Sequence, residues 1–134
     1  MITHLIDSNI LIDIVAGIEA LAASSQAVLD PLLSRGCAGI NQIVYAEVLA
    51  GYAAPGMFDA VYPPSLLKRV DLPWEAAWLA GRAHREYRAR RGSKTSPMPD
   101  FYVGAHAQIA GLTLVTRDAV RYRTYFPAVP VVTP

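Results

Sequence analysis

The residues of this chain that are best suited to do chemistry are four carboxylates set in short motifs: Asp7, Glu47, Asp100 and Asp118. Each is expected where a strand ends or near the start of a helix. Carboxylates that are brought close together repel one another, so a fold that gathers them usually does so around a cation. Oxygen ligands favour Mg²⁺ or Mn²⁺, and such ions act on phosphate groups. The sequence therefore suggests a metal-dependent enzyme for phosphate esters.

Short apolar segments alternate with helical segments along the whole chain, which predicts an α/β fold with a parallel sheet and helices on both faces. Ligands bind beyond the carboxyl ends of the strands in such sheets. Asp7 and Asp118 follow predicted strands, whereas Glu47 and Asp100 lie on predicted helices beside those ends. We expect one domain over residues 1–134, with strands at 3–6, 37–40, 67–72, 113–115 and 129–132.

A simpler interpretation is that three of these acids only cap helices. Asp7, Asp100 and Asp118 all precede or begin predicted helices, where a carboxylate is favourable. Glu47 resists this explanation because it lies in an otherwise apolar helix, and an unpaired buried carboxylate is costly. We therefore favour the metal site over unrelated caps.

Composition and charge narrow the function further. With 53% hydrophobic and 17% charged residues, the chain can bury a core, and Cys37, its single cysteine, fits a reducing compartment. Residues 1–67 carry one basic residue against six acidic ones, whereas residues 68–134 carry eleven against five. An acidic pocket beside a basic surface suits an enzyme that acts on a polyanion.

The basic residues concentrate on one predicted helix, which runs from Pro73 to about Arg91, and on the segment after it. A basic strip that leads to Asp100 is typical of a surface that follows an RNA backbone. The alternatives are an ordinary solvated helix end or contact with an acidic partner protein. The candidate RNA-binding residues are Arg82, Arg85, Arg88, Arg91 and Lys94.

Four motifs occur in a fixed order: Leu-Ile-Asp-Ser-Asn-Ile at 5–10, Ala-Glu at 46–47, Pro-Met-Pro-Asp-Phe-Tyr-Val-Gly-Ala-His-Ala at 97–107 and Leu-Val-Thr-Arg-Asp at 114–118. In these motifs the chain resembles the PIN domain, specifically the VapC toxins of bacterial toxin–antitoxin pairs. The resemblance extends from Leu5 to about Phe126. Each motif alone is a weak signal, but the four together are specific.

The resemblance implies the toxin of a type II toxin–antitoxin system. Such a toxin is an endoribonuclease that uses one or two Mg²⁺ or Mn²⁺ ions and metal-activated water to hydrolyse RNA. It further implies a VapB-type antitoxin, a homodimer and a cytoplasmic location without a membrane. The implied catalytic and metal-binding residues are Asp7, Glu47, Asp100 and Asp118, with Ser8, Asn9 and Thr116 as polar supports.

Three other functions compete with this one. They are a housekeeping PIN-type nuclease without an antitoxin, a non-catalytic PIN module that binds RNA or protein, and a structure-specific DNA nuclease of related fold. The complete set of acids argues against the binding module, and the short chain argues against the DNA nuclease.

Several other residues receive structural interpretations. We expect Trp74 and Trp78 in the core, with an interface as the second choice, and Pro31 as a break in the helix over residues 19–34. Tyr122 and Tyr125 are interpreted as packing residues, with stacking on bases as the alternative. His106 is expected to be hydrogen-bonded within the fold. Among the remaining acids, Asp13 and Asp59 are predicted to be solvated surface groups.

Overall fold

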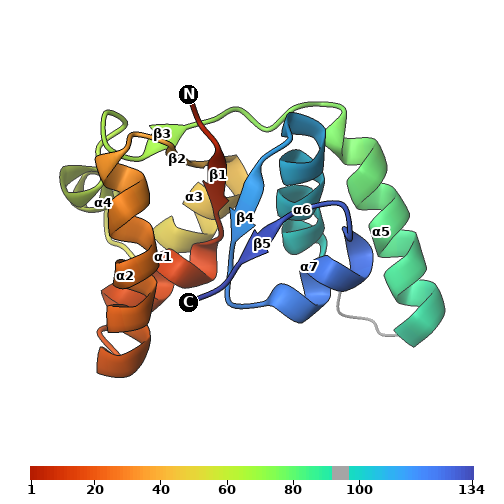
Figure 1. The fold of residues 1–134 in the computed structure, drawn as a ribbon, viewed down its shortest axis with the longest axis horizontal. Coiled ribbons are helices and arrows are strands. Elements are labelled where there is room, and N and C mark those ends of the chain that lie inside the picture. The colour runs from red at the N-terminus through yellow and green to blue at the C-terminus, as the bar shows by residue number, and fades with distance from the viewer. Residues whose placement is uncertain (92–96) are drawn as a thin grey trace.

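The structure is a computed structural model that describes residues 1–91 and 97–134. Five strands of the described chain form one sheet, and every neighbouring pair runs parallel. The predicted α/β class and the parallel sheet flanked by helices are confirmed (Figure 1). In spatial order the strands are β3 (Lys68–Arg69), β2 (Ala38–Ile40), β1 (His4–Ile6), β4 (Thr113–Val115) and β5 (Val131–Val132).

The helices connect these strands and cover the sheet. Figure 1 shows α3 and α6 behind the sheet, α2 in front of it, and α5 at the right against α6. None of the helices in the described part of the chain is long and apolar enough to cross a membrane. The helices are α1 (Ser8–Ala16), α2 (Glu19–Ser34), α3 (Gln42–Leu49), α4 (Pro55–Val61), α5 (Ala76–Arg91), α6 (Met98–Ala110) and α7 (Ala119–Tyr125).

The register of the central strands determines where the acidic residues meet. Strand β1 pairs with β2 on one side and β4 on the other, and Ile6 lies opposite Val115. Asp7 and Thr116 directly follow these two strands, so they lie side by side at the same edge of the sheet. Leu5 and Leu114 are fully buried, which anchors both strands in the core below that edge.

Two local predictions are wrong. Pro31 lies inside a continuous helix α2 and does not divide it. Its ring is exposed and lies in the last turn, where little of the helical ladder remains to be disrupted. Strand β3 contains only Lys68–Arg69, shorter than the predicted 67–72. As an edge strand it has one neighbour, β2, and pairs with it only at these residues.

The tryptophans are not in the core. Trp74 is 90% exposed and Trp78 is 70% exposed, so the prediction of burial is wrong. Helix α5 instead buries the small side chains of Ala76, Ala80 and Ala83, which let it pack closely against α6. Both rings are thereby left on the outer surface of the fold.

Candidate metal centre

Three of the four predicted acids meet at the carboxyl edge of the sheet. Oxygen atoms of Asp7, Glu47 and Asp100 all lie within 4.8 Å of one another. They come from three elements that are distant in sequence: the end of β1, the last turn of α3 and the first turn of α6. The fold therefore brings together the acids that the sequence motifs single out.

Asp7 is almost completely buried, and its carboxylate accepts hydrogen bonds from four neighbouring groups. Its Oδ1 accepts from the backbone N–H of Ser8 at 2.8 Å, as the N-cap of α1. Its Oδ2 accepts from the hydroxyl groups of Thr116 at 2.8 Å and Tyr122 at 3.0 Å. A longer contact of 3.4 Å comes from the side-chain amide of Asn9. These donors fix the carboxylate and favour its ionised form.

Glu47 is held by its neighbours on α1 and by the placement of α3. The hydroxyl group of Ser8 donates to its Oε1 at 3.0 Å. Asn41 begins α3 by accepting from the backbone N–H of Val44, and its amide contacts the Nδ1 of His106 on α6 at 3.0 Å. This buried contact ties the helix of Glu47 to the helix of Asp100, and it confirms that His106 is hydrogen-bonded within the fold.

Asp118 is not among the three clustered acids, and an arginine links it to them. The Nη1 of Arg121 forms an ion pair with Asp100 and lies 3.4 Å from the Oδ2 of Asp118. The Asp118 backbone N–H donates to Thr116, which in turn donates to Asp7. Asp118 thus borders the site, and its metal-binding role stays a prediction.

Burial raises the pKa values of all three clustered acids, and the charge of a neighbouring acid adds to each rise. Burial, opposed by its hydrogen bonds, raises the pKa of Asp7 to about 6. Burial also raises the pKa of Glu47, with a smaller contribution from the charge of Asp100. The pKa of Asp100 is raised by burial although Arg121 lowers it in part. The ionised forms of all three acids are therefore disfavoured when no cation is bound.

A divalent cation suits this arrangement. The donor set consists of three carboxylates on a well-packed frame, which matches the preference of Mg²⁺ and Mn²⁺ for hard oxygen ligands. A cation would also stabilise the ionised forms of the three carboxylates, which burial disfavours. Asp7, Glu47 and Asp100 are the residues that would hold it.

The polar residues beside the acids form a network that joins β1 to β4. The Asn9 amide group donates to Thr116 at 3.2 Å, and its carbonyl accepts from the backbone N–H of Arg117 at 3.1 Å. Ser8, Asn9 and Thr116 are therefore in place to orient Asp7 and Glu47. Their supporting role in catalysis remains a prediction.

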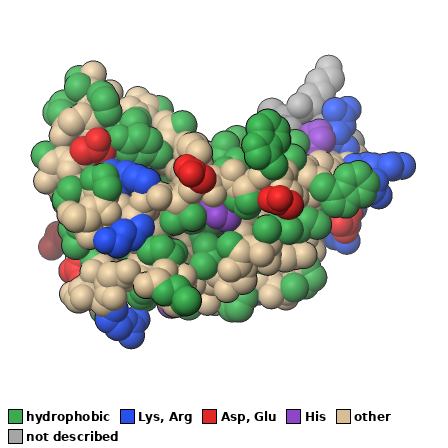
Figure 2. All heavy atoms as spheres, turned by 90° about the horizontal axis from the view of Figure 1, so that it is seen from above, with side chains coloured by type: hydrophobic (Ala, Val, Ile, Leu, Met, Phe, Trp, Pro, Cys, Tyr) green, Lys and Arg blue, Asp and Glu red, His purple; other side chains and the backbone are tan. Residues whose placement is uncertain are grey.

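The basic residues of α5 lie beyond the acids. Arg82, Arg85 and Arg88 are exposed, and Arg82 also lies over the Trp78 ring at 5.4 Å. Figure 2 shows Lys and Arg side chains gathered at its right-hand end, where Figure 1 places α5. Lys94 lies outside the described residues, as does the side chain of Arg91. RNA binding by this set remains a prediction.

Two acids expected to be solvated have partners instead. Asp13 on α1 forms an ion pair with Arg117, whose guanidinium also donates to the backbone carbonyl of Leu21 on α2. Asp59 pairs with Arg69 at 2.7 Å. The Asp13 pair joins α1 and α2 to the loop before Asp118, so its effect is to hold the frame of the site.

Sequence reasoning missed two residues at the site itself. Tyr122 is fully buried and packs in the core as expected, but its hydroxyl group also donates a hydrogen bond to Asp7. Arg121 neutralises part of the charge of Asp100. The one available signal was their place on the short helix that follows Asp118, which brings both residues back toward the carboxyl edge.

Comparison with known proteins identifies the family. The model of the PIN domain matches residues 4–127. This chain belongs to the PIN-domain family. The family is of the nuclease type, which agrees with an acidic cluster suited to a divalent cation. No curated protein matches the sequence significantly.

Several solved protein complexes contain a chain with a similar fold. The VapBC2 complex of Rickettsia felis, bound to a promoter DNA fragment, aligns with a TM-score of 0.68 and 21% identity over 99% of this chain and 98% of that chain. FitAcB of Neisseria gonorrhoeae aligns at 0.69 and 19%, covering 96% of both chains. A toxin–antitoxin complex of Klebsiella pneumoniae aligns at 0.64 and 25%, covering 98% of both.

Proposed function

We propose that this PIN domain is the toxin of a type II toxin–antitoxin system and cleaves RNA as a Mg²⁺- or Mn²⁺-dependent endoribonuclease in the cytoplasm. The observation that carries the proposal is the cluster of Asp7, Glu47 and Asp100 on a PIN fold. A nuclease needs a site of this kind because a phosphodiester is already negative and resists attack.

The residues of the site are proposed to have different roles in metal binding, orientation and RNA binding. Asp7, Glu47 and Asp100 would hold one or two ions, while Ser8 and Thr116 keep two of these carboxylates oriented. A bound divalent ion lowers the pKa of water, neutralises phosphate oxygens and stabilises the leaving oxygen. Asp118 borders the same space and is proposed to act through water. The exposed arginines of α5 would bind the RNA backbone beside the site.

An apolar groove beside Glu47 supports a protein partner. It lies between α1 and α3 and has a volume of about 250 Å³. Ile12 and Val15 in its wall are 43% and 48% exposed, which is unfavourable unless another surface covers them. An antitoxin segment in this groove would lie next to a metal-binding acid and block the site. The complexes with similar folds support an antitoxin of this kind.

The exposed tryptophans at and just before the start of α5 support self-association. Trp74 and Trp78 present large apolar surfaces of the kind found at interfaces. We propose a homodimer, and light scattering on the purified protein and on Trp78→Ser would test it. A monomeric wild-type protein at every concentration would contradict the dimer.

Cleavage of total RNA by the purified protein tests the enzymatic proposal. Discrete fragments should form with Mg²⁺ or Mn²⁺ and disappear with EDTA and with Asp7→Asn. Asp30→Asn is the matched control, because Asp30 is exposed on α2 and should leave cleavage unchanged. If folded Asp7→Asn cleaves like the wild type, the proposed mechanism is wrong.

Growth of bacteria that express the chain separates a toxin from a housekeeping nuclease. A toxin should stop growth, Asp7→Asn should not, and the product of a neighbouring small gene should restore growth. Normal growth despite active, soluble enzyme would favour the housekeeping role.

A further inference from the structure

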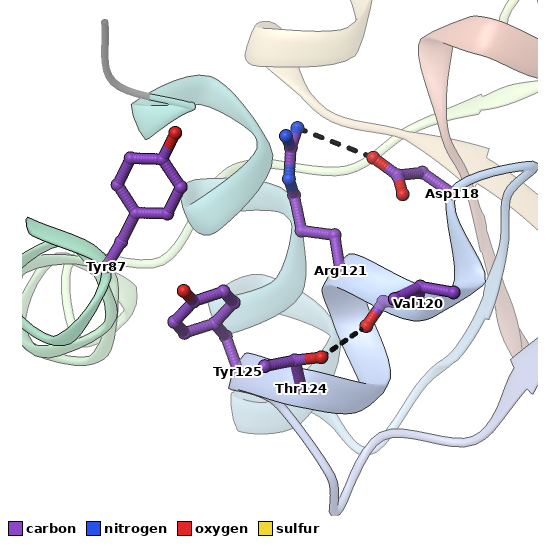
Figure 3. Close-up of a pocket in the computed structure, with 6 residues that line it drawn as sticks. All are labelled: Tyr87, Asp118, Val120, Arg121, Thr124 and Tyr125. Atoms are coloured by element: carbon purple, nitrogen blue, oxygen red, sulfur yellow. Dashed lines mark hydrogen bonds and ion pairs between the residues drawn. The ribbon is translucent and has the colours of Figure 1, made fainter. Parts of the chain in front are cut away.

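A separate pocket opens next to the acidic cluster, between α5 and α7. Its volume is about 160 Å³. Figure 3 shows two tyrosine rings on one side and Arg121 and Asp118 on the other. Its walls therefore combine aromatic surface with a guanidinium group within reach of the site. The lining residues are Tyr87, Asp118, Val120, Arg121, Thr124 and Tyr125.

Arg121 retains hydrogen-bonding capacity that its ion pairs do not use. A guanidinium has five N–H donors in a fixed fork. Among the described residues, its contacts with Asp100 and Asp118 both run through Nη1. Two adjacent N–H groups of a guanidinium, such as those on Nε and Nη2, can bind a phosphate with two parallel hydrogen bonds. The side chain is 33% exposed, so a ligand can reach it.

Neighbouring aromatic rings hold the aromatic wall of the pocket, Tyr87 and Tyr125, in place. Tyr125 packs against Phe101 with ring centroids 5.1 Å apart, and against Tyr87 at 6.1 Å. Arg90 of α5 lies over the Tyr125 ring at 5.6 Å. Two half-buried rings that are fixed in this way offer a ready surface for a flat apolar group.

We propose that this pocket binds one nucleotide of single-stranded RNA adjacent to the phosphate that is cleaved. The inference rests on the proposed function. Arg121 contacts the phosphate of that nucleotide, and its base packs against Tyr87 and Tyr125. The pocket would thus give the enzyme a contact with an unpaired base, in addition to the general attraction of α5 for the backbone.

Single-stranded RNA fits these walls better than an acidic peptide or a duplex. An acidic side chain could pair with Arg121, but it would leave the aromatic wall of Tyr87 and Tyr125 unoccupied. Bases in an RNA duplex are stacked inside it and cannot reach the rings. An unpaired nucleotide supplies both a phosphate and a flat base, the combination that aromatic and arginine side chains recognise.

Binding without cleavage tests the proposal. A short fluorescent single-stranded RNA of mixed sequence is titrated in EDTA at low salt and followed by anisotropy. Stacking on one aromatic ring predicts that Tyr125→Leu weakens binding at least about five-fold. Arg121→Gln should weaken it similarly. Arg123→Gln removes the same charge from an exposed position on the same helix and should change binding less than about two-fold.

A second pair of variants avoids any disturbance of the packed rings. Val120 lines the pocket and is 77% exposed, so Val120→Glu should fold and repel the nucleotide. Val61→Glu on α4 is the matched control, because Val61 is 59% exposed and lies outside the pocket. Binding of an RNA duplex with the same sequence should not change in Tyr125→Leu.

The outcomes separate this proposal from the proposed function. If the wild type cleaves RNA but Val120→Glu and Arg121→Gln bind the single strand as well as the wild type does, the pocket is not a nucleotide site. An equal loss in Arg121→Gln and Arg123→Gln also overturns it, because charge alone then explains binding. Absence of cleavage by wild-type protein with metal would instead count against the ribonuclease itself.

Discussion

Replacing Asp7 with Asn should stabilise the metal-free protein while it abolishes metal-dependent cleavage. The pKa of Asp7 is about 6 in the folded protein against an ordinary value of 3.8. Between these values the folded state binds more protons than the unfolded state. The free energy of unfolding therefore falls as the pH rises from about 4 to about 6, and it stays low above that range. Asn carries no charge, so the free energy of unfolding of the variant does not fall in this way.

The size of the effect follows from the raised pKa and the hydrogen bonds. A rise from 3.8 to about 6 corresponds to ~3 kcal/mol at neutral pH. If the amide oxygen of Asn takes the place of Oδ2 and accepts from Thr116 and Tyr122, its NH₂ group faces the backbone N–H of Ser8, and the one hydrogen bond lost there costs ~1 kcal/mol. The net gain is ~2 kcal/mol, or ~8 °C in melting temperature for a chain of this length.

Thermal unfolding in EDTA across a pH series measures this directly. Asp7→Asn should melt slightly below the wild type near pH 4, where the lost hydrogen bond dominates, and above the wild type as the pH rises to about 6. Mg²⁺ should then raise the melting temperature of the wild type and leave the variant unchanged, because binding to the folded state alone is stabilising.

Asp13→Asn is a control that should change the melting temperature in the opposite direction. It makes the same chemical change on the neighbouring helix α1, but it removes the partner of Arg117 and should lower the melting temperature. If Asp7→Asn melts below the wild type at neutral pH in EDTA, the carboxylate is not under electrostatic strain. The argument for a cation at this position would then lose its main support.

Three further substitutions test the frame of the site. Tyr122→Phe removes a hydrogen bond that lowers the pKa of Asp7, so the midpoint pH for Mg²⁺-induced stabilisation should rise; an unchanged midpoint would contradict this. Gly104→Ala places a methyl group 2.4 Å from the Phe126 ring and should cost ~1–3 kcal/mol in urea unfolding. Asn41→Ala removes the cap of α3 and should cost at least ~1 kcal/mol in the same assay.

The parts of this molecule that are predictable from sequence are those determined by local pattern. Alternating apolar segments and capping residues predict the parallel sheet, and Asp7 follows β1 as expected. The order of the sheet then explains why Thr116 lies beside Asp7, since β1 and β4 are neighbours in register. Glu47 and Asp100 join them because their helices pack against the same edge.

Features that depend on long-range partners were not predictable. Asp13 meets Arg117 across 104 positions of sequence, and no local pattern indicates which acids find such partners. Trp74 and Trp78 are apolar, yet the small alanines of α5 occupy its buried face. Tyr122 satisfied the pattern of a core residue, and only the placement of α7 reveals that its hydroxyl group reaches Asp7.

The surroundings of Asp7 combine two opposing requirements, and this combination indicates a site built for a cation. A residue chosen only to cap α1 would be stable on the surface, where solvent keeps its pKa low. Asp7 is instead buried near two other carboxylates, which destabilises its charge, while four neighbouring groups donate to it and so preserve its ability to ionise. A protonated acid would need fewer donors, and an isolated anion would not be placed beside other anions. A carboxylate that is ionised in order to bind a cation explains both the four donors and the neighbouring carboxylates.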